Sequence, residues 1–319
     1  VARPAPAIIP PPPPAPPASG SDFGATSVTF GVCEGAQIVS SAEPIDTTAY
    51  YGRPPEELID AIAGRVDSIK SDGVGAVGVG IPGLVDYEHG HIFEITNVPG
   101  WVEVPFRDLL GARVGMPVSV DNDANCMAYA EWRHGAGKGY SDLIAITLGT
   151  GVGGGLVIGR QLHRGAQFCA GEIGHTSIDF QSPAGDGRMP GIIEKFVGNR
   201  EIAAHAKRLY AEAGIEKNIA DCTPKALAGA GDVLATQVWQ DIADWLGVAL
   251  ANAIYLLNPQ AIIIGGGIAM AGPVLFEPLR EKLNQLLTPV LAENLQLLPA
   301  KFGNEAGIIG AAAQAAVQD

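Results

Sequence analysis

Apolar residues recur at helical spacing in several stretches of this chain. Over Pro54–Lys70 they are Leu58, Ile59, Ile62, Val66 and Ile69. The residues Ser-Asp-Gly that follow are a stop signal, so this stretch is predicted to be one helix. Similar spacing predicts a helix over Val238–Leu257. A helix over Ala124–His134 is predicted to be opened by Asp123 and closed near Gly135, and Ala306–Val317 is predicted to be a helix of small residues.

Shorter apolar runs around glycine-containing turns predict two β-hairpins. In the first, Ser27–Cys33 and Ala36–Ser40 flank Glu34-Gly35. In the second, Leu143–Leu148 and Gly154–Ile158 flank the glycine-rich residues 149–153. The segments DFGATSVTFGV and TLGTGVGGGLV are alike, because each places Gly and Thr in a turn before an apolar strand. This similarity, although weak, predicts an internal repeat of two α/β halves.

The order of the predicted elements indicates how the two halves divide the chain. Further buried strands are predicted over Val74–Gly80 and Ala261–Ile264, so strands and helices alternate. We expect an N-terminal α/β domain over residues 22–121 and a C-terminal α/β domain over residues 122–305. The closing helix, about residues 306–319, is predicted to pack back on the first half.

The first 21 residues differ from the rest in composition. The sequence VARPAPAIIPPPPPAPPASGS is rich in Pro and Ala, and it has no basic region before an apolar core as a signal peptide would have. Because proline fixes φ and removes the backbone donor, we expect a polyproline II or disordered tail over residues 1–21. A ligand for a proline-binding module is the alternative interpretation.

Composition and charge narrow the function classes. The 319 residues are 47% hydrophobic and 17% charged, which is typical of a globular protein with two modest domains. The formal net charge of −14 argues against nucleic acid as a partner. No apolar run is long enough for a membrane helix, so no membrane partner is expected. The four cysteines form no CxxC pair, which favours a reducing, cytoplasmic location.

Two glycine-rich loops contain the residue types that nucleotide phosphates need. Glycine lets backbone N–H groups approach phosphate oxygens, and threonine supplies a small hydroxyl donor. The candidates are Asp22, Gly24 and Thr26 in the first loop and Thr150, Gly151 and Gly153 in the second. Asp22 is also a candidate to hold the water shell of Mg²⁺. Each loop alone is more often a simple tight turn, but matching places in two halves favour phosphate binding.

A third glycine run, made of Gly265, Gly266 and Gly267, follows the strand Ala261–Ile264. A flat adenosine could lie against this backbone, although such a run is more often only a structural turn. The patterns GxxxxGK[ST] and strand–GxGxxG–helix are absent from the sequence, which argues against P-loop and dinucleotide-binding proteins.

Six short motifs together resemble the ROK family of bacterial sugar kinases and sugar-responsive repressors. They are DFGAT at 22–26, GIPGLVD at 80–86, NVPGW at 97–101, DNDAN at 121–125, LGTGVGGG at 148–155 and GEIGH at 171–175. Their order and spacing match the family from about Asp22 to the C-terminus. The resemblance implies a two-domain actin-like ATPase (ribonuclease H-like) fold, with the sugar and ATP bound in the interdomain cleft, and a homodimer.

The resemblance also implies that Asp123 is the general base for the attacking sugar hydroxyl. A carboxylate suits this role because a hydroxyl is a poor nucleophile, while positioning supplies most of the remaining rate enhancement. Asp123 stands where a helix begins, so N-capping is the alternative interpretation, and the two roles are compatible.

The sugar-binding residues that the resemblance implies are Gly83, Asn97, Asn122, Glu172, His175 and Glu194. Carboxylates and amides suit a polyhydroxyl ligand because they make directed hydrogen bonds. Without the motif, His175 would be interpreted as a core or surface histidine and Glu194 as a solvated helix residue.

Two departures from the family pattern change the expectations. Many members bind structural zinc through the GEIGH histidine and a CxCGxxGC segment, but Gly185, Gly187 and Ile192 stand at the three cysteine positions here. No zinc is therefore expected, and packing must hold this loop. The family also begins with an apolar strand, whereas Pro-Pro-Ala-Ser-Gly-Ser precedes Asp22 here and Ala25 replaces a glycine. This predicts a poorly anchored first phosphate loop.

The function that fits best is an ATP-dependent hexose kinase acting on the 6-hydroxyl of glucose, with ATP and Mg²⁺ as cofactors. A kinase for another hexose or N-acetylmannosamine, and a sugar-binding pseudokinase, are the alternatives. Polyphosphate as the donor also stays open, because such relatives lack the same cysteines. A sugar-responsive repressor is disfavoured, since those relatives carry a helix-turn-helix domain before the kinase-like region, and the net charge is wrong for DNA.

Overall fold

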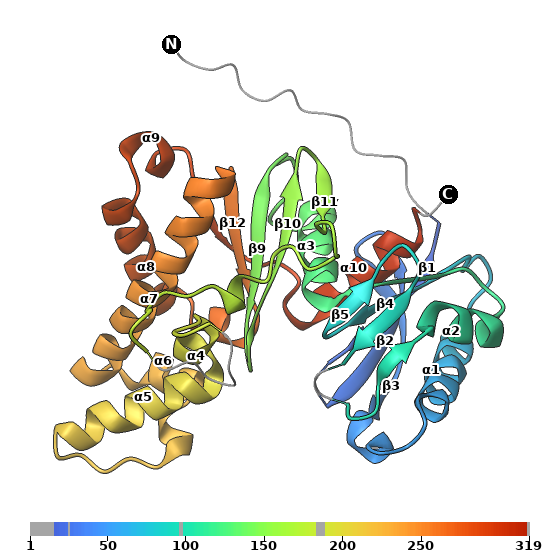
Figure 1. Cartoon of the computed structure of the whole chain (residues 1–319), viewed down its shortest axis with the longest axis horizontal. Coiled ribbons are helices and arrows are strands. Elements are labelled where there is room, and N and C mark those ends of the chain that lie inside the picture. The colour runs from blue at the N-terminus through green and yellow to red at the C-terminus, as the bar shows by residue number, and fades with distance from the viewer. Residues whose placement is uncertain (1–15, 25, 96–97, 183–188, 318–319) are drawn as a thin grey trace. The chain divides into compact units, whose positions relative to one another are not determined.

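The computed structural model describes residues 16–24, 26–95, 98–182 and 189–317. The chain divides into two compact units, one of Val1–Ser141 with Glu305–Asp319 and the other of Asp142–Asn304. Both are built from one central sheet with helices packed on it (Figure 1). The division follows Ser141, whereas the sequence pattern placed it at residue 121. The reason is that helix α3 (Asp123–His134) packs against helix α10 (Ala306–Ala315) of the first unit.

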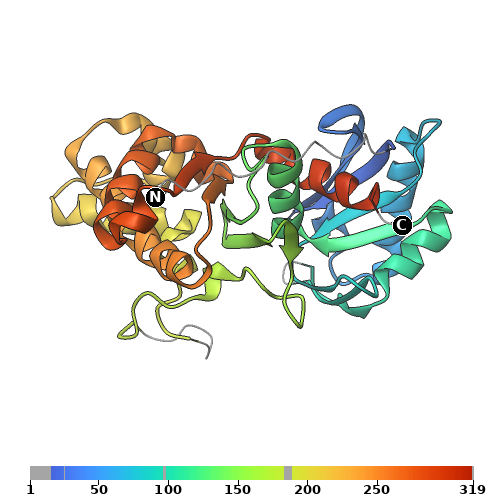
Figure 2. The ribbon, with the colours of Figure 1, turned by 90° about the horizontal axis from the view of Figure 1, so that it is seen from above.

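The first unit has a five-stranded sheet in the order β3-β2-β1-β4-β8. Its strands are β1 (Ala18–Phe23), β2 (Ser27–Glu34), β3 (Gln37–Asp46), β4 (Val77–Ile81) and β8 (Val118–Asn122). Strands β1, β4 and β8 are parallel, while β2 and β3 form the predicted antiparallel hairpin. Helices α1 (Pro55–Ile69) and α2 (Phe106–Val114) share a buried core with one face of this sheet. Helices α3 and α10 lie side by side on the other face (Figures 1 and 2).

The second unit repeats this sheet with the order β11-β10-β9-β12-β13. Its strands are β9 (Leu143–Leu148), β10 (Val152–Ile158), β11 (Gln161–His163), β12 (Ala261–Gly265) and β13 (Gln296–Pro299). Strands β9, β12 and β13 are parallel, and β10 and β11 are antiparallel to their neighbours, as β2 and β3 are in the first unit. The internal repeat predicted from two similar hairpins therefore extends to the whole sheet.

The remaining elements position loops around these sheets. The second unit carries the helices α4 (Glu194–Val197), α5 (Asn199–Glu212), α6 (Pro224–Ala230), α7 (Val233–Leu257), α8 (Pro273–Leu286) and α9 (Pro289–Ala292). A small sheet in the first unit consists of β5 (Leu84–Asp86), β6 (His91–Glu94) and β7 (Val102–Val104). Single 3₁₀ turns are η1 (Thr47–Tyr50), η2 (Ile173–His175), η3 (Ile219–Cys222), η4 (Gly267–Ala271) and η5 (Gly303–Glu305). Within the described part of the chain, none of these helices is long and apolar enough to cross a membrane.

The helix predictions are confirmed, with small changes at the ends. The predicted helix over residues 54–70 is α1, and the one over residues 306–317 is α10, which ends two residues earlier. Helix α7 begins at Val233, five residues before the predicted start. Asp232 explains this, because its side chain accepts the Ala235 N–H at 2.9 Å and so caps the helix.

Strand β1 corrects the prediction of a tail over residues 1–21, because residues 18–21 belong to the sheet. They pair with β2 on one side and β4 on the other. The small residues that seemed unfit for a strand allow α10 to approach closely. A Cβ atom added at Gly20 or at Gly78 of β4 would overlap the backbone of α10. Residues 1–15 lie outside the described residues.

The close approach of α10 comes with buried hydroxyl groups on the other face of β1. Side chains alternate along a strand, so Ser19 and Ser21 point to the side opposite Gly20, toward the core that contains Phe23. Both serines are at most 1% exposed, and neither hydroxyl has a hydrogen-bond partner. Such groups destabilise a fold, so β1 is well placed but not well packed.

Candidate active site

The corner between β8 and α3 carries the DNDAN motif. Asn122 is the N-cap of α3, since its Oδ1 accepts the N–H groups of Ala124 at 2.9 Å and of Asn125 at 3.2 Å. Its Nδ2 donates to the carbonyl oxygen of Gly83 at 3.2 Å, which joins two of the predicted sugar-binding residues. The interpretation of Asp123 as the N-cap is therefore wrong, because the residue before it has that role.

Asp123 is the first residue of α3 and is partly buried. One of its carboxylate oxygens accepts the Ala124 N–H at 2.8 Å. The positive end of the helix dipole stabilises the ionised form at such a position. A carboxylate is the kind of group that can accept a proton, which is the chemistry that a general base requires.

Asp121 and Asn125 support this corner, and the motif analysis assigned neither of them a role. Asp121 is 3% exposed, and its Oδ1 accepts the Asn122 N–H at 2.8 Å and the Asn125 Nδ2 at 3.1 Å. Asp121 belongs to β8 and Asn125 to the first turn of α3, so their contact spans the corner between strand and helix. An acid followed four residues later by an amide at a predicted helix start is the signal that would have found them.

The first candidate phosphate loop is held at both ends. The Gly24 N–H donates to the Ser27 carbonyl oxygen at 2.8 Å, and the Thr47 N–H donates to the Thr26 carbonyl oxygen at 3.0 Å. Thr26 itself is exposed, as a residue that meets a phosphate must be. The loop is thus better anchored than the sequence predicted, because β1 leads into it. Ala25 lies outside the described residues.

Asp22 lies at the end of β1, against the first turn of α10. A Cβ atom at Gly307 would overlap its carboxylate, so the glycine leaves room for this side chain in its present position. Burial raises the pKa of Asp22 from 3.8 to about 6. Carboxylate oxygens together with water suit Mg²⁺, and a bound cation would favour the ionised form and lower this pKa. The residue therefore fits the magnesium role that the sequence suggested.

The second candidate phosphate loop is the turn between β9 and β10. The Gly149 N–H donates to the Gly151 carbonyl oxygen at 3.0 Å, which closes the turn. Thr150 at its tip is exposed, as Thr26 is in the first loop, and Gly153 pairs with Thr147 in the ladder that follows. The two loops thus occupy equivalent places in the two repeated sheets.

The three glycines at the end of β12 differ in how much space surrounds them. Gly265 is the last residue of β12 and pairs with Thr147 of β9. A Cβ atom at Gly266 would overlap the backbone of Leu148, and the residue has a φ of +84°. Both features favour glycine in the turn that follows β12. A Cβ atom at Gly267 would meet nothing within 4 Å. The backbone at Gly267 is therefore accessible to a flat ligand such as adenosine.

Three predicted sugar-binding side chains come together in the second unit. His175 Nε2 lies 3.7 Å from Glu172 Oε2, and both side chains are partly exposed. Burial raises the pKa of Glu172, the positive charge of His175 opposes that shift, and the negative charge of Glu194 adds to it. Glu172 is therefore influenced electrostatically by both His175 and Glu194, and we call these three residues the cluster around Glu172; that they bind sugar stays a prediction.

The segment that precedes Glu194 is held by backbone pairing. The Ile178 N–H donates to Gly191 and the Ile193 N–H donates to Thr176, both at 2.9 Å, and Ser177 bridges Ile192. These bonds tie the segment to the end of the GEIGH motif. Two of the three cysteine positions, Gly185 and Gly187, lie outside the described residues. No group of three metal-ligating side chains occurs in the described ranges.

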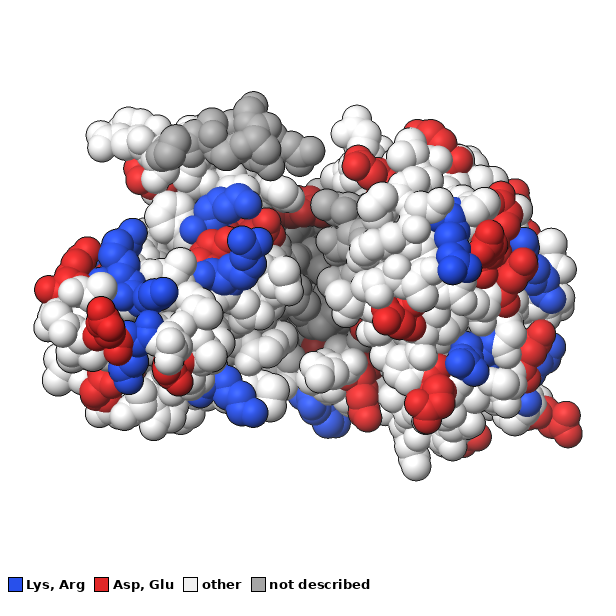
Figure 3. All heavy atoms as spheres, turned by 90° about the horizontal axis from the view of Figure 1, so that it is seen from below, with Lys and Arg blue, Asp and Glu red and all other residues white. Residues whose placement is uncertain are grey.

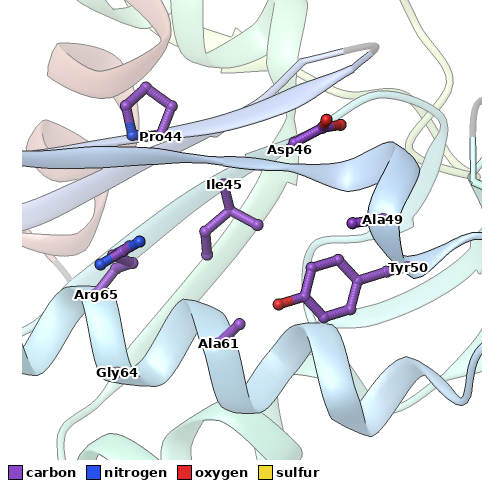
Figure 4. Close-up of a pocket in the computed structure, with 8 residues that line it drawn as sticks. All are labelled: Pro44, Ile45, Asp46, Ala49, Tyr50, Ala61, Gly64 and Arg65. Carbon is purple, nitrogen blue, oxygen red and sulfur yellow. The ribbon is translucent and has the colours of Figure 1, made fainter.

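The predicted site residues thus form sets within each unit. The first unit holds Asp22, Gly24, Thr26, Gly83, Asn122 and Asp123, and the second holds Thr150, Gly151, Gly153, Glu172, His175, Glu194, Gly265, Gly266 and Gly267. Asn97 lies outside the described residues. A separate groove of about 520 Å³ lies between β3, η1 and α1 (Figure 4), and no predicted site residue lines it.

The charged side chains give no sign of a basic surface on the face shown in Figure 3. There Lys and Arg side chains are interspersed with Asp and Glu side chains over both units. This agrees with the formal net charge of −14.

Comparison with known proteins identifies the family. The model of the ROK family matches residues 18–317. The chain belongs to the ROK family. It is 33% identical over 314 residues to a glucokinase of Streptomyces coelicolor, which covers 92% of this chain and 95% of that protein. It is also 33% identical over 305 residues to a glucokinase of Thermotoga maritima, with the same coverage.

A solved structure extends this similarity to the fold. The ROK family glucokinase from Streptomyces griseus in complex with glucose and AMPPNP matches with a TM-score of 0.78 and 32% identity. The match covers 94% of this chain and 99% of that one. The predicted actin-like ATPase fold is thus confirmed, and the comparisons support a glucokinase-like hexose kinase that uses ATP.

Proposed function

We propose that this protein transfers the γ-phosphoryl group of ATP to the 6-hydroxyl of glucose, with Asp123 as the general base. The observation that carries the proposal is the division of roles at the start of α3. Asn122 makes the cap, so Asp123 is not needed for it and its carboxylate stands at the positive end of the helix dipole. The relatives named glucokinase support the choice of acceptor.

The residues have distinct parts in the proposed reaction. Asp123 accepts the proton of the sugar hydroxyl as that oxygen attacks phosphorus. Glu172, His175 and Glu194, together with Gly83, Asn97 and Asn122, bind the sugar and orient it. Thr26 and Thr150, with the backbone of Gly24, Gly151 and Gly153, bind the phosphates, and the backbone of Gly265 to Gly267 contacts adenosine. Asp22 would hold the water shell of Mg²⁺, which supplies neutralising charge on the phosphates.

Selectivity for glucose would come from the cluster around Glu172. A site that makes directed hydrogen bonds to each hydroxyl rejects an epimer, because a moved hydroxyl leaves buried polar groups unpaired. The three side chains of the cluster can each accept or donate such a bond. An epimer of glucose should therefore show a much lower kcat/KM.

The cellular setting is part of the same proposal. We expect Mg²⁺ as cofactor, no zinc, a homodimer and a cytoplasmic location, with no nucleic acid or membrane partner. The net charge of −14 supports the absence of a nucleic-acid partner, and the spacing of the cysteines supports the cytoplasmic location and the absence of zinc. Sedimentation analysis of the purified protein would test the dimer.

An ADP-release screen tests the function. The purified protein is given ATP or polyphosphate with glucose, mannose, fructose, allose or N-acetylmannosamine. We expect glucose with ATP to have the highest kcat/KM. A higher kcat/KM for another sugar would identify that sugar as the preferred acceptor. A higher kcat/KM with polyphosphate would identify polyphosphate as the preferred donor. Sugar binding without any turnover would indicate a pseudokinase.

A further inference from the structure

Glu194 contacts the second phosphate loop as well as belonging to the sugar cluster. Its Oε2 accepts the Val152 N–H at 3.0 Å, in the first residue of β10. A Cβ atom at Gly151 would overlap the same oxygen, so only glycine leaves room for the carboxylate at this point. The side chain that is predicted to bind sugar is therefore also a structural part of the loop that is predicted to bind phosphate.

The backbone around Glu194 strengthens this link. Glu194 begins α4, and its carbonyl oxygen accepts the Gly198 N–H at 3.1 Å. The next residue, Asn199, donates its N–H to the carbonyl oxygen of Gly149 at 2.9 Å. The turn at residues 149–151 is thus fixed to this short segment at two points, one through a side chain and one through the backbone.

The charge of Glu194 reaches the sugar cluster on its other side. Its negative charge contributes to the raised pKa of Glu172, which places the two carboxylates within electrostatic reach of each other. A sugar hydroxyl that donates to the other oxygen of Glu194 would hold the carboxylate in the orientation that accepts the Val152 N–H.

We propose that Glu194 is a positioning residue that couples sugar binding to nucleotide binding, and this rests on the proposed function. One carboxylate oxygen holds the Val152 N–H while the other accepts a sugar hydroxyl. Sugar binding fixes the carboxylate and so orders the turn before the nucleotide arrives, which lowers the entropic cost of binding the phosphates. Linkage makes the effect reciprocal, so the nucleotide must tighten sugar binding by the same factor.

Calorimetric titration with AMPPNP and Mg²⁺ tests the coupling, with and without saturating glucose. For the unaltered protein we expect glucose to lower the Kd of AMPPNP by about 5-fold or more, within the range usual for coupled sites. Glu194→Asp shortens the side chain so that it cannot span both partners, and the ratio of the two Kd values should approach one. The matched control is Glu172→Gln, which weakens glucose binding but should keep the ratio once glucose is saturating.

A second variant tests the same contact from the side of the phosphate loop. Gly151→Ala adds a Cβ that displaces the Glu194 carboxylate, so glucose should bind several-fold more weakly even without nucleotide. The coupling would be overturned if Glu194→Asp and Glu172→Gln gave the same ratio of AMPPNP Kd values without and with glucose. It would also be overturned if glucose did not change the Kd of AMPPNP for the unaltered protein. Turnover of glucose by that same protein is measured separately, so a failed coupling with normal turnover leaves the proposed function intact.

Discussion

Asn122 and Asp123 divide two tasks at the start of α3 that a single residue could have carried. The amide of Asn122 satisfies two helix N–H groups and reaches Gly83. The neighbouring carboxylate of Asp123, which also accepts the Ala124 N–H, lies at a position where the helix dipole favours its charge. This division is a property of side chains, and it leads to the first prediction.

We expect Asp123→Asn to lower kcat by about 10²–10⁴-fold, because the amide keeps the shape but cannot accept the proton. The KM for glucose should change little, since the variant retains the polar contacts. The measurement is steady-state kinetics with ATP and glucose, beside Asp67→Asn on the exposed side of α1 as a control. Near-normal turnover in Asp123→Asn would remove this residue from the role of base.

Asp22 should show a trade-off between stability and activity that depends on pH. Its pKa in the folded protein, about 6, lies above the ordinary value of 3.8, so the folded state holds the proton more tightly. Its contribution to stability is therefore present in full below pH 3.8 and is lost as the pH rises through 6. Above that pH the fold carries the cost of a buried charge.

Asp22→Asn should therefore raise the melting temperature by a few degrees at pH 7.5 and leave it unchanged near pH 4. Turnover with Mg²⁺ and ATP should fall in the same variant, because the carboxylate is lost. Thermal unfolding at several pH values checks the expected change in melting temperature, and kinetics at pH 7.5 check the expected loss of turnover. A destabilised variant at pH 7.5 would mean that a partner compensates the buried charge.

Strand β1 shows at the scale of an element how packing overrides composition. Its glycine and serine residues pack little apolar surface, yet the strand lies in the middle of its sheet. Pairing on both sides uses only backbone groups, and α10 needs the absence of side chains at Gly20 and Gly78. The same element leaves the Ser19 and Ser21 hydroxyls buried without partners.

Replacing Ser21 with alanine should stabilise the protein by about 1–3 kcal/mol, because it removes a buried hydroxyl that has no hydrogen bond. Chemical denaturation measures the free energy of unfolding. Ser41→Ala on the exposed side of β3 is the matched control and should change it little. A loss of stability in Ser21→Ala would show that the hydroxyl has a partner in solution, such as a bound water.

Replacing Gly78 with alanine should destabilise the protein by about 1–3 kcal/mol, since the added methyl group overlaps the backbone of α10 at Ala311. Gly64→Ala in α1 is the contrasting variant. A Cβ atom at Gly64 meets nothing within 4 Å, and alanine is the better helix former by about 0.5–1 kcal/mol. Opposite signs in chemical denaturation are expected, and equal losses would contradict the close approach of α10.

At the scale of the whole molecule, two sheets of the same strand order carry equivalent phosphate loops. Thr26 lies in the turn between β1 and β2, Thr150 lies in the turn between β9 and β10, and both are exposed. The repeat explains why a strand forms before Ser27, because β1 takes the place that β9 has in the other unit.

The purified protein should contain less than about one tenth of a zinc ion per chain, because no cysteine occupies the three ligand positions of the family pattern. Elemental analysis of untagged protein measures this directly. A chelator should leave the melting temperature unchanged, since backbone pairing between residues 176–178 and 191–193 holds the segment. About one zinc per chain would overturn the prediction.

The sequence by itself determined the features that depend on local spacing and on motifs. Apolar periodicity was sufficient for the helices α1 and α7, because a helix that buries one face repeats its apolar residues at helical spacing. Motifs of a few residues were sufficient for the family. Both kinds of signal are contained in short windows of the chain.

Only the tertiary structure decided the features that depend on residues far apart in the chain. Strand β1 exists because β2, β4 and α10 surround it, and no apolar pattern marks it. Helix α3 belongs to the first unit because α10 returns to it from the other end of the chain. The contact between Glu194 and Val152 joins residues 42 positions apart, and such a bond has no signature in either local sequence. The physical reason is that packing and hydrogen bonding across the chain depend on the partner as much as on the residue itself.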